Sequence, residues 1–322
     1  MSITRPSTVG RRSILMASSG VLFLAACGSD DSDSSGETTS EDSEEGGGSE
    51  PSGPLSISAI PDQDPELLNR LYPDVASRFA EATGLEVEYQ PVTDYTAVVR
   101  AFEVGDVYIV WMGALTGVQA ASRVEGAQAF AQRDIDPEFH SLLIANRSAG
   151  IEPFDDAEGM QALEGKTLTF GSETSTSGRL MPQFYMEEGG LDLADLNGSP
   201  GFSGSHDATI EAVASGSFEV GALNEQVWEA TVEAGEVDLT DVVVLYRTPP
   251  YANYHWLARP DVDEVFGEGT LQSVTDLLLG LDPANEEDAA ILELFGAESF
   301  IETENSNYDG IKTVAENLDL LT

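Results

Sequence analysis

Strand-like and helix-like segments alternate along most of this chain, and that alternation limits the fold more than any other feature. In residues 65–82, for example, Leu67, Leu71 and Val75 recur at helical spacing before Gly84 ends the pattern. Such alternation predicts an α/β fold with a largely parallel sheet. The expected strands are residues 55–60, 85–90, 107–111, 141–145, 166–170, 219–223 and 242–246, and the clearest expected helices are 65–82, 95–104, 270–280, 285–295 and 308–320.

The order of these segments suggests two lobes. A second unit begins near Gly150, and Thr248-Pro249-Pro250 forms a stiff crossover after the last expected strand. Ligand sites in open α/β sheets lie at the C-terminal ends of strands, so we expect a ligand cleft between the lobes. The expected boundaries are about 55–147 plus 250–322 for lobe 1 and about 148–249 for lobe 2, with hinge crossovers near 145–150 and 247–251.

Residues 1–27 have the features of an export signal. Three arginines, Arg5, Arg11 and Arg12, precede an apolar run at 14–26 that is shorter than the roughly 20 residues needed to span a bilayer. The sequence Leu24-Ala25-Ala26-Cys27 resembles a lipobox, in which the cysteine is lipidated and becomes the first residue of the mature chain. The Arg11-Arg12 pair is a partial match to a twin-arginine signal, and a general secretory route remains an alternative.

Residues 28–54 contain only Gly, Ser, Thr, Asp, Glu and Pro. Without apolar residues this segment cannot bury a core, so we expect a disordered tether. Because Cys27 is the only cysteine, disulfides, cysteine metal sites and thiol catalysis are excluded. The expected product is a folded module, lipid-anchored to the outer face of the cytoplasmic membrane.

The charge balance is strongly acidic, with 14 Lys and Arg against 58 Asp and Glu and a formal net charge of −44. This excludes nucleic acid as a partner and leaves the lipid anchor as the expected membrane contact. The pattern resembles the solvated surface of a salt-adapted protein. Screening confines long-range repulsion of an anionic ligand to roughly 8 Å, so locally placed donors can still bind one.

The segment from Lys166 to Gly178 reads as a strand followed by a hydroxyl-rich turn and a helix. A helix start offers unpaired backbone N–H groups and the positive end of the macrodipole, so it binds oxyanions. The side chains of Ser175, Thr176 and Ser177 add three hydroxyl donors, and Gly178 permits close approach. The simpler interpretation is that one hydroxyl only caps the helix.

Two further residues lie at predicted helix starts. One is His206, which follows Ser205 and could meet the same anion, although a capping or packed histidine is the alternative. The other is Tyr95, which follows Asp94 and could donate from its phenol or pack in the core. We expect both to contact the ligand.

Enzyme signatures are missing from the sequence. The Gly165-Lys166-Thr167 segment does not form a phosphate-binding loop, because Gly159 is one residue too far away and a strand follows. The histidines have no metal-ligand spacing, and no Gly-x-Ser-x-Gly elbow occurs. We therefore expect neither an enzyme, a metal site nor a cofactor.

Three motifs together resemble the periplasmic phosphonate/phosphite-binding proteins of ABC importers. They are Asp94-Tyr95-Thr96-Ala97-Val98-Val99, Ser175-Thr176-Ser177-Gly178 and Gly204-Ser205-His206-Asp207-Ala208. Within that family, Ala59-Ile60-Pro61-Asp62-Gln63, the run from Ala131 to His140 and Thr248-Pro249-Pro250-Tyr251 are most similar to a subgroup of selenate-binding lipoproteins.

The resemblance implies a type II periplasmic-binding-protein fold, with two lobes that close on an oxyanion, and a monomer. It places Tyr95, Ser175, Thr176, Ser177 and His206 at the ligand. Asn224 stands where the family commonly has an Asp that faces an ammonium or a protonated oxygen. Further candidate ligand contacts are Thr116, Arg133, Arg179 and Tyr251, with surface pairing to Glu187 or Glu188 as the alternative for Arg179.

An amide at 224 favours a fully ionised oxyanion such as selenate or sulfate, because it removes the strong acceptor that a protonated oxygen needs. The neighbouring Glu225 could restore that acceptor. The predicted function is therefore an exported, lipid-anchored solute-binding protein that delivers a small tetrahedral oxyanion to an ABC permease. A sensor module for the same ligand and an enzyme on the same scaffold are the alternatives.

Overall fold

The computed structural model describes residues 53–321, which lie within one compact unit. The predicted export signal, the lipidation site Cys27 and nearly all of the predicted tether lie outside the described residues. Within 53–321, no helix combines the length and the apolar character needed to cross a membrane.

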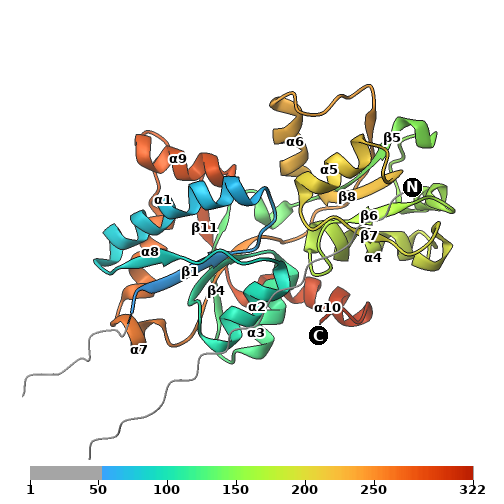
Figure 1. The fold of residues 1–322 in the computed structure, drawn as a ribbon. Helices are drawn as coiled ribbons and strands as arrows, with labels where there is room; N and C mark the ends of the chain where they lie inside the picture. The colour runs from blue at the N-terminus through green and yellow to red at the C-terminus, as the bar shows by residue number, and fades with distance from the viewer. Residues whose placement is uncertain (1–52, 322) are drawn as a thin grey trace, which may run out of the picture. The chain divides into compact units, whose positions relative to one another are not determined.

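The described residues form two sheets, each with its own helices (Figure 1). The first sheet has the strand order β11-β4-β10-β3-β1-β2, and α1 packs against α8 and α9 while α3 packs against α2 and α10. Its elements are β1 (Leu55–Ala59), α1 (Pro65–Thr83), β2 (Val87–Tyr89), α2 (Tyr95–Val104), β3 (Ile109–Met112), α3 (Ala114–Arg123), β4 (Gln128–Arg133), β10 (His255–Ala258), α7 (Val262–Phe266), α8 (Thr270–Leu279), α9 (Glu286–Phe295), β11 (Phe300–Glu302) and α10 (Asp309–Asn317).

The second sheet has the order β7-β6-β8-β5-β9, with α5 packed on β8 and β5. Its elements are β5 (Ser141–Asn146), β6 (Leu168–Phe170), a π-helix (Thr176–Leu180) that leads into α4 (Met181–Glu188), β7 (Gly201–Phe202), α5 (His206–Ala214), β8 (Val220–Asn224), α6 (Glu225–Glu233) and β9 (Val242–Arg247). We call the parts built on the first and second sheets lobe 1 and lobe 2.

Local sequence explains where the helices begin and end. Asp64 accepts hydrogen bonds from the first amides of α1, Pro65 occupies its first turn, and Gly84 ends it in the left-handed conformation. Asp94 caps α2 in the same way and leaves Tyr95 as its first residue. Local capping therefore places Tyr95 at a helix start, as the sequence predicts.

The prediction of a largely parallel sheet is wrong, because both sheets are mixed. Parallel pairs join β1 to β2 and β3, and β6 to β7 and β8. The two strands that follow a crossover between lobes, β5 and β10, run antiparallel to their neighbours. Parallel pairing requires a crossover connection such as the helix of a strand–helix–strand unit. The strands β5 and β10 enter from the other lobe and belong to no such unit, so they can pair antiparallel.

The predicted lobe boundary near residue 147 is also misplaced. The strand Ser141–Asn146 pairs with β8 and β9, so it belongs to lobe 2. The crossovers run from β4 to β5, residues 134–140, and from β9 to β10, residues 248–254. An isolated bridge between Phe139 and Tyr251 joins the two crossovers side by side. A hinge at this pair remains a proposal.

Candidate anion-binding site

The hydroxyl-rich turn after β6 forms a helix start, as the sequence predicts. Ser175 caps the π-helix, and its Oγ accepts a hydrogen bond from Gly178 N at 3.0 Å. The first amides of the turn have no intrahelical partner and carry the positive end of the dipole. Ser175 is thus the N-cap that the simpler interpretation expects. The hydroxyl oxygens of Ser175 and Thr176 accept hydrogen bonds from backbone amides, so the hydroxyl protons of Ser175, Thr176 and Ser177 can still be donated to a ligand.

A second helix start, that of α3, meets this one from lobe 1. Leu115 N donates to Thr176 Oγ1 at 2.9 Å, and Ala114 N donates to Asn253 Oδ1 at 3.2 Å. A Cβ on Gly113 would lie 3.1 Å from Thr176 Oγ1, so a glycine permits this close approach. Two helix N-termini from different lobes therefore converge on buried hydroxyl and amide groups.

Three buried groups at this place make no hydrogen bond with any described residue. They are the Tyr95 hydroxyl, Ser177 Oγ and Asn253 Nδ2. Burial raises the pKa of Tyr95. The Ser175 hydroxyl is near enough to Tyr95, and the Ser177 hydroxyl to Tyr251, to lower the pKa of each phenol, but neither pair meets hydrogen-bond geometry. Buried polar groups in native proteins are nearly always paired. Three unpaired donors beside two helix starts therefore fit an acceptor-rich ligand.

His206 lies at the same site and is 0% exposed. Its backbone N donates to Asp62 O at 3.0 Å, and its Nδ1 accepts from Asn224 N at 3.4 Å. The ring fills the space in front of Gly178, where a Cβ would lie 3.2 Å from His206 Cε1, so the glycine makes room for the ring. Burial lowers the pKa of His206 to about 3, and the ring is therefore neutral at physiological pH.

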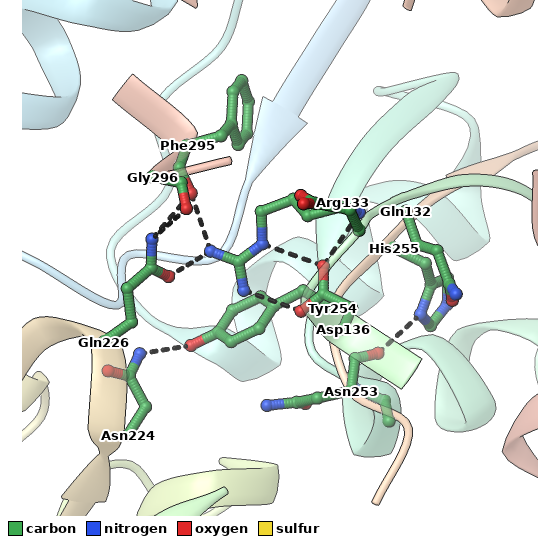
Figure 2. Close-up of polar contacts among 12 residues, drawn as sticks. Gln132, Arg133, Asp136, Asn224, Gln226, Asn253, Tyr254, His255, Phe295 and Gly296 are labelled. Atoms are coloured by element: carbon green, nitrogen blue, oxygen red, sulfur yellow. Dashed lines mark hydrogen bonds and ion pairs between the residues drawn. The ribbon is translucent and has the colours of Figure 1, made fainter. Parts of the chain in front are cut away.

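Asn224 lies next to His206, but both ends of its amide are engaged. Its Oδ1 accepts from Val227 N at 2.6 Å as the cap of α6, and its Nδ2 donates to the Tyr254 hydroxyl at 3.0 Å (Figure 2). The same hydroxyl lies 3.4 Å from His206 Nε2. Asn224 therefore positions Tyr254 in this structure, and direct contact with a ligand remains a proposal.

Arg133, a candidate ligand contact, is fully engaged elsewhere. Figure 2 shows its guanidinium between two groups of lobe 1 and one of lobe 2. Nε and Nη2 bind Asp136 Oδ2 and Oδ1 at 2.8 and 2.7 Å, while Nη1 donates to Phe295 O at 2.8 Å and to Gln226 Oε1. The geometry thus places Arg133 in a buried contact between the lobes, and direct contact with a ligand stays a proposal.

Gln226 completes this contact from α6. Its Nε2 donates to the carbonyls of Phe295 and Gly296 at 2.8 and 3.1 Å (Figure 2). A Cβ on Gly296 would lie 1.7 Å from Gln226 Nε2. The Gln226 side chain of lobe 2 can thus pack against the C-terminal end of α9 only because residue 296 has no side chain.

The Nε of Arg179 is a further buried donor without a hydrogen-bond partner among the described residues. Its guanidinium stacks 4.7 Å from the ring centroid of Phe170 and 5.1 Å from that of Phe202, and it forms no ion pair with a described acidic residue. The predicted ion pair with Glu187 or Glu188 is not formed in the described residues, and contact of Arg179 with the ligand stays a proposal.

The remaining candidates have partners within the protein. Thr116 Oγ1 donates to Gly113 O at 2.9 Å, and the Tyr251 hydroxyl shares a 2.6 Å hydrogen bond with Ser141 Oγ. Glu225 forms an ion pair with Arg247 and so does not supply the acceptor that we considered for it. Thr116 and Tyr251 border the site, with Tyr251 beside Ser177.

Sequence reasoning missed three residues of the site. Asn253 and Tyr254 lie in the second crossover, where no helix start or motif marks them, and only the contact between lobes brings them to the donors. Asp62 lies in the segment Ala59–Gln63 that carried part of the resemblance, but nothing in the sequence singled it out. Its burial, with 6% exposed, is the signal that the structure adds.

Acidification should destabilise the unliganded protein through its buried histidines. Burial lowers the pKa of His255 from 6.5 to about 4. Below pH 6.5 the unfolded chain takes up a proton that the folded chain refuses, so stability is lost as the pH falls toward about 4. At about pH 5 this amounts to about 2 kcal/mol per histidine.

A His255→Gln variant isolates this contribution. Urea unfolding at about pH 7 and about pH 5 should show the variant improving by about 2 kcal/mol relative to wild type on acidification. His206 contributes in the same direction in both proteins and Asp62 in the opposite one, so both cancel in the comparison. A difference between the two proteins that does not change with pH would contradict a neutral, buried His255.

Comparisons with known proteins come from sequence and structure. The sequence profile described as "ABC transporter, phosphonate, periplasmic substrate-binding protein" matches residues 57–308. The chain is 37% identical over 266 residues to the probable ABC transporter phosphite binding protein PhnD1 of Prochlorococcus marinus (strain MIT 9301), covering 82% of this chain and 90% of that protein. The solved structure of PhnD1 from that organism in complex with methylphosphonate superposes with a TM-score of 0.81, covering 83% of this chain and 98% of that one.

A more distant relative is the phosphate-import protein PhnD of Mycolicibacterium smegmatis, 23% identical over 277 residues, covering 81% of this chain and 85% of that protein. At 23% identity this relative does not indicate which ligand the chain binds. Its match over most of the chain is consistent with the fold shared with the PhnD1 structure.

Proposed function

The chain belongs to the family of periplasmic phosphonate substrate-binding proteins of ABC transporters, and on that premise we propose that it captures a small tetrahedral oxyanion of the phosphonate or phosphite kind for import. It is an exported substrate-binding protein and not an enzyme. The finer parts of the proposal are the lipid anchor at Cys27, the permease that receives the ligand, and the anion itself.

The observation that carries the proposal is the set of buried donors without partners. Tyr95, Ser177 and Asn253 offer protons from three different segments, and two helix starts add oriented amides. A ligand that accepts hydrogen bonds in several directions satisfies all of them at once, as a tetrahedral oxyanion does. Hydrogen bonds to an ionised acceptor contribute roughly 1.5–3 kcal/mol each, so a few give substantial affinity.

Affinity is coupled to lobe closure in this proposal. Donors of lobe 1 and lobe 2 meet only when the lobes are together, and the buried contact of Arg133 with Gln226 holds them together away from the anion site. The paired crossovers at 134–140 and 248–254 are the proposed hinge. In this proposal the closed protein, acting as a monomer tethered by its lipid anchor, is the form that docks on the permease.

The ligand candidates differ in whether they carry a proton. Methylphosphonate and phosphite exist partly as monoanions with one P–OH group near neutral pH, whereas selenate and sulfate are fully ionised. The amide at Asn224 favours the second class, but its two ends are engaged by Val227 and Tyr254. The relatives point to the first class, since one is named for phosphite and its structure contains methylphosphonate.

Calorimetric titration of the purified protein at matched ionic strength tests the proposal. We expect methylphosphonate or phosphite to bind at micromolar concentration or tighter, with selenate, sulfate and phosphate as comparison ligands. A protein that binds none of these anions would refute the assignment of the buried donors. Binding of the same ligand without uptake by cells that contain the permease would favour the sensor alternative.

A further inference from the structure

Asp62 is a buried carboxylate beside the anion site that has no assigned role. It follows β1 in lobe 1, is 6% exposed, and its backbone carbonyl accepts the hydrogen bond from His206 N at 3.0 Å. Its carboxylate faces the hydroxyl of Tyr254, which also contacts Asn224 and His206. Asp62 thus lies against the same His206–Asn224–Tyr254 group that borders the unpaired donors.

The surroundings leave this carboxylate without a cationic partner. The nearest cation is Arg133, whose Nε and Nη2 both bind Asp136, and no described basic group forms an ion pair with Asp62. The Tyr254 phenol contacts it, and the titratable groups near enough for their pKa values to be coupled to it are Tyr72, Tyr89, Tyr95 and Asp207. Burial raises the pKa of Asp62 to about 6, and Asp207 adds to that rise while Tyr254 and Arg133 oppose it.

A small cavity separates Asp62 from the other lobe. It has a volume of about 20 Å³ and is lined by Asp62, Trp111, Arg133, Asn224, Gln226 and Phe295 among others. That volume suits one water molecule or one ligand atom with its hydrogen. Asn224 lines the cavity and contacts His206 at the anion site, whereas Tyr95, Ser177 and Asn253 do not line the cavity. An oxygen of a bound anion that reached past Asn224 would meet the Asp62 carboxylate.

We propose that Asp62 accepts a hydrogen bond from a protonated oxygen of the bound anion and thereby selects phosphonate or phosphite monoanions over selenate and sulfate. The inference rests on the proposed function, since it assigns a ligand class to the same site. The donors at Tyr95, Ser177 and Asn253 bind the ionised oxygens, and Asp62 supplies the acceptor that neither Asn224 nor the paired Glu225 can offer. One proton is then shared between Asp62 and the ligand.

A fully ionised anion brings no proton to share with Asp62. Because two negative groups would then face each other in a buried site, binding must take up a proton from solvent. For selenate that proton goes to Asp62, whose carboxylate would otherwise face the anion across a buried gap without a cation. At about pH 8, two units above the pKa of Asp62, protonating this group weakens selenate binding by about 100-fold. Methylphosphonate brings its own proton below its second pKa, and above that pKa it loses affinity only in proportion to the fraction that is dianion.

The test is the ratio of the affinities for methylphosphonate and selenate at about pH 8 in wild type, Asp62→Asn and Glu225→Gln. In Asp62→Asn we expect methylphosphonate to bind roughly 10- to 100-fold more weakly and selenate to bind more tightly, so the ratio falls by at least about 100-fold. The control Glu225→Gln removes one negative charge from a partly exposed ion pair near the site, and should change both affinities by less than about threefold.

A ratio that stays unchanged in Asp62→Asn, including the case in which both affinities fall together, would overturn the inference and leave Asp62 a structural residue. A second measurement needs no variant. In wild type, methylphosphonate affinity should fall tenfold per pH unit above the second pKa of the ligand, and a flat profile there would overturn the inference as well. If wild type binds no anion of the panel, the proposed function itself fails; if wild type binds but the ratio holds, only the role of Asp62 fails.

Discussion

A protein that carries both Tyr95→Phe and Ser177→Ala should bind methylphosphonate roughly 1,000-fold more weakly than wild type and melt at the same or a higher temperature. Each substitution removes a hydroxyl that would donate to an ionised oxygen, worth roughly 1.5–3 kcal/mol. In the unliganded structure neither hydroxyl has a partner, so its removal also relieves a buried unsatisfied group. Calorimetry and thermal unfolding measure the two effects separately.

The matched control is Ser58→Ala. Ser58 is also fully buried, but its Oγ donates to Gln90 O at 2.7 Å in the core of lobe 1. This variant should lose about 1 kcal/mol of stability and keep its affinity. Loss of stability without loss of affinity in the Tyr95/Ser177 variant would mean that these hydroxyls are structural, and the anion-site assignment would be wrong.

An Arg133→Met variant should lose about 3–5 kcal/mol of stability, because it leaves Asp136 buried without its cation. Asp136 is 0% exposed and accepts hydrogen bonds from Nε and Nη2 of the guanidinium. The ring centroid of Tyr254 lies 4.8 Å from the guanidinium carbon. For a chain of this size the loss corresponds to a fall of roughly 10 °C in melting temperature. Methionine keeps most of the packing volume, so the missing charge dominates the result.

Arg247→Met is the control for this prediction, since Arg247 pairs with Glu225 and is half exposed, with 53% of its side chain accessible. Removing an exposed pair should cost no more than about 1 kcal/mol. If Arg133→Met instead retained its stability and lost only ligand affinity, Arg133 would act at the ligand and not in holding the lobes together.

The parts of the site that the sequence predicts are those encoded by local helix starts. Asp94 caps α2 and so places Tyr95, and Ser175 and Ser205 cap the helices that carry Ser177 and His206. Capping depends on neighbours within three residues, so a sequence pattern contains it. That these residues meet a common ligand is still a proposal.

The parts that the sequence does not predict depend on contacts between distant segments. Asn253 and Tyr254 reach the site because the second crossover folds against α3 and β8, and Asp62 is buried among residues of both lobes. The sequence makes Arg133 a candidate ligand contact but does not reveal its part in the contact between the lobes. Its partners Gln226 and Phe295 are 93 and 162 residues away, which no local pattern reveals.

In the fold, too, features set by local sequence are predicted and features set by long-range contacts are not. Strand positions such as β1, β6 and β8 agree with the apolar patterns, and the two-lobe α/β architecture is confirmed by the superposition on the PhnD1 structure. The expectation of parallel pairing is wrong for the predicted strand β5, and β10, where no strand is predicted, is antiparallel as well; a lone strand that arrives through a crossover has no helix pattern to fix its direction. The lobe boundary was wrong for the same reason.

A crystal structure of the protein with bound methylphosphonate tests the central claim most directly. We predict that the three oxygens lie within hydrogen-bond distance of donors that include Ser177 Oγ and the Tyr95 hydroxyl. A phosphonate found elsewhere, with both hydroxyls still unpaired, would contradict the account.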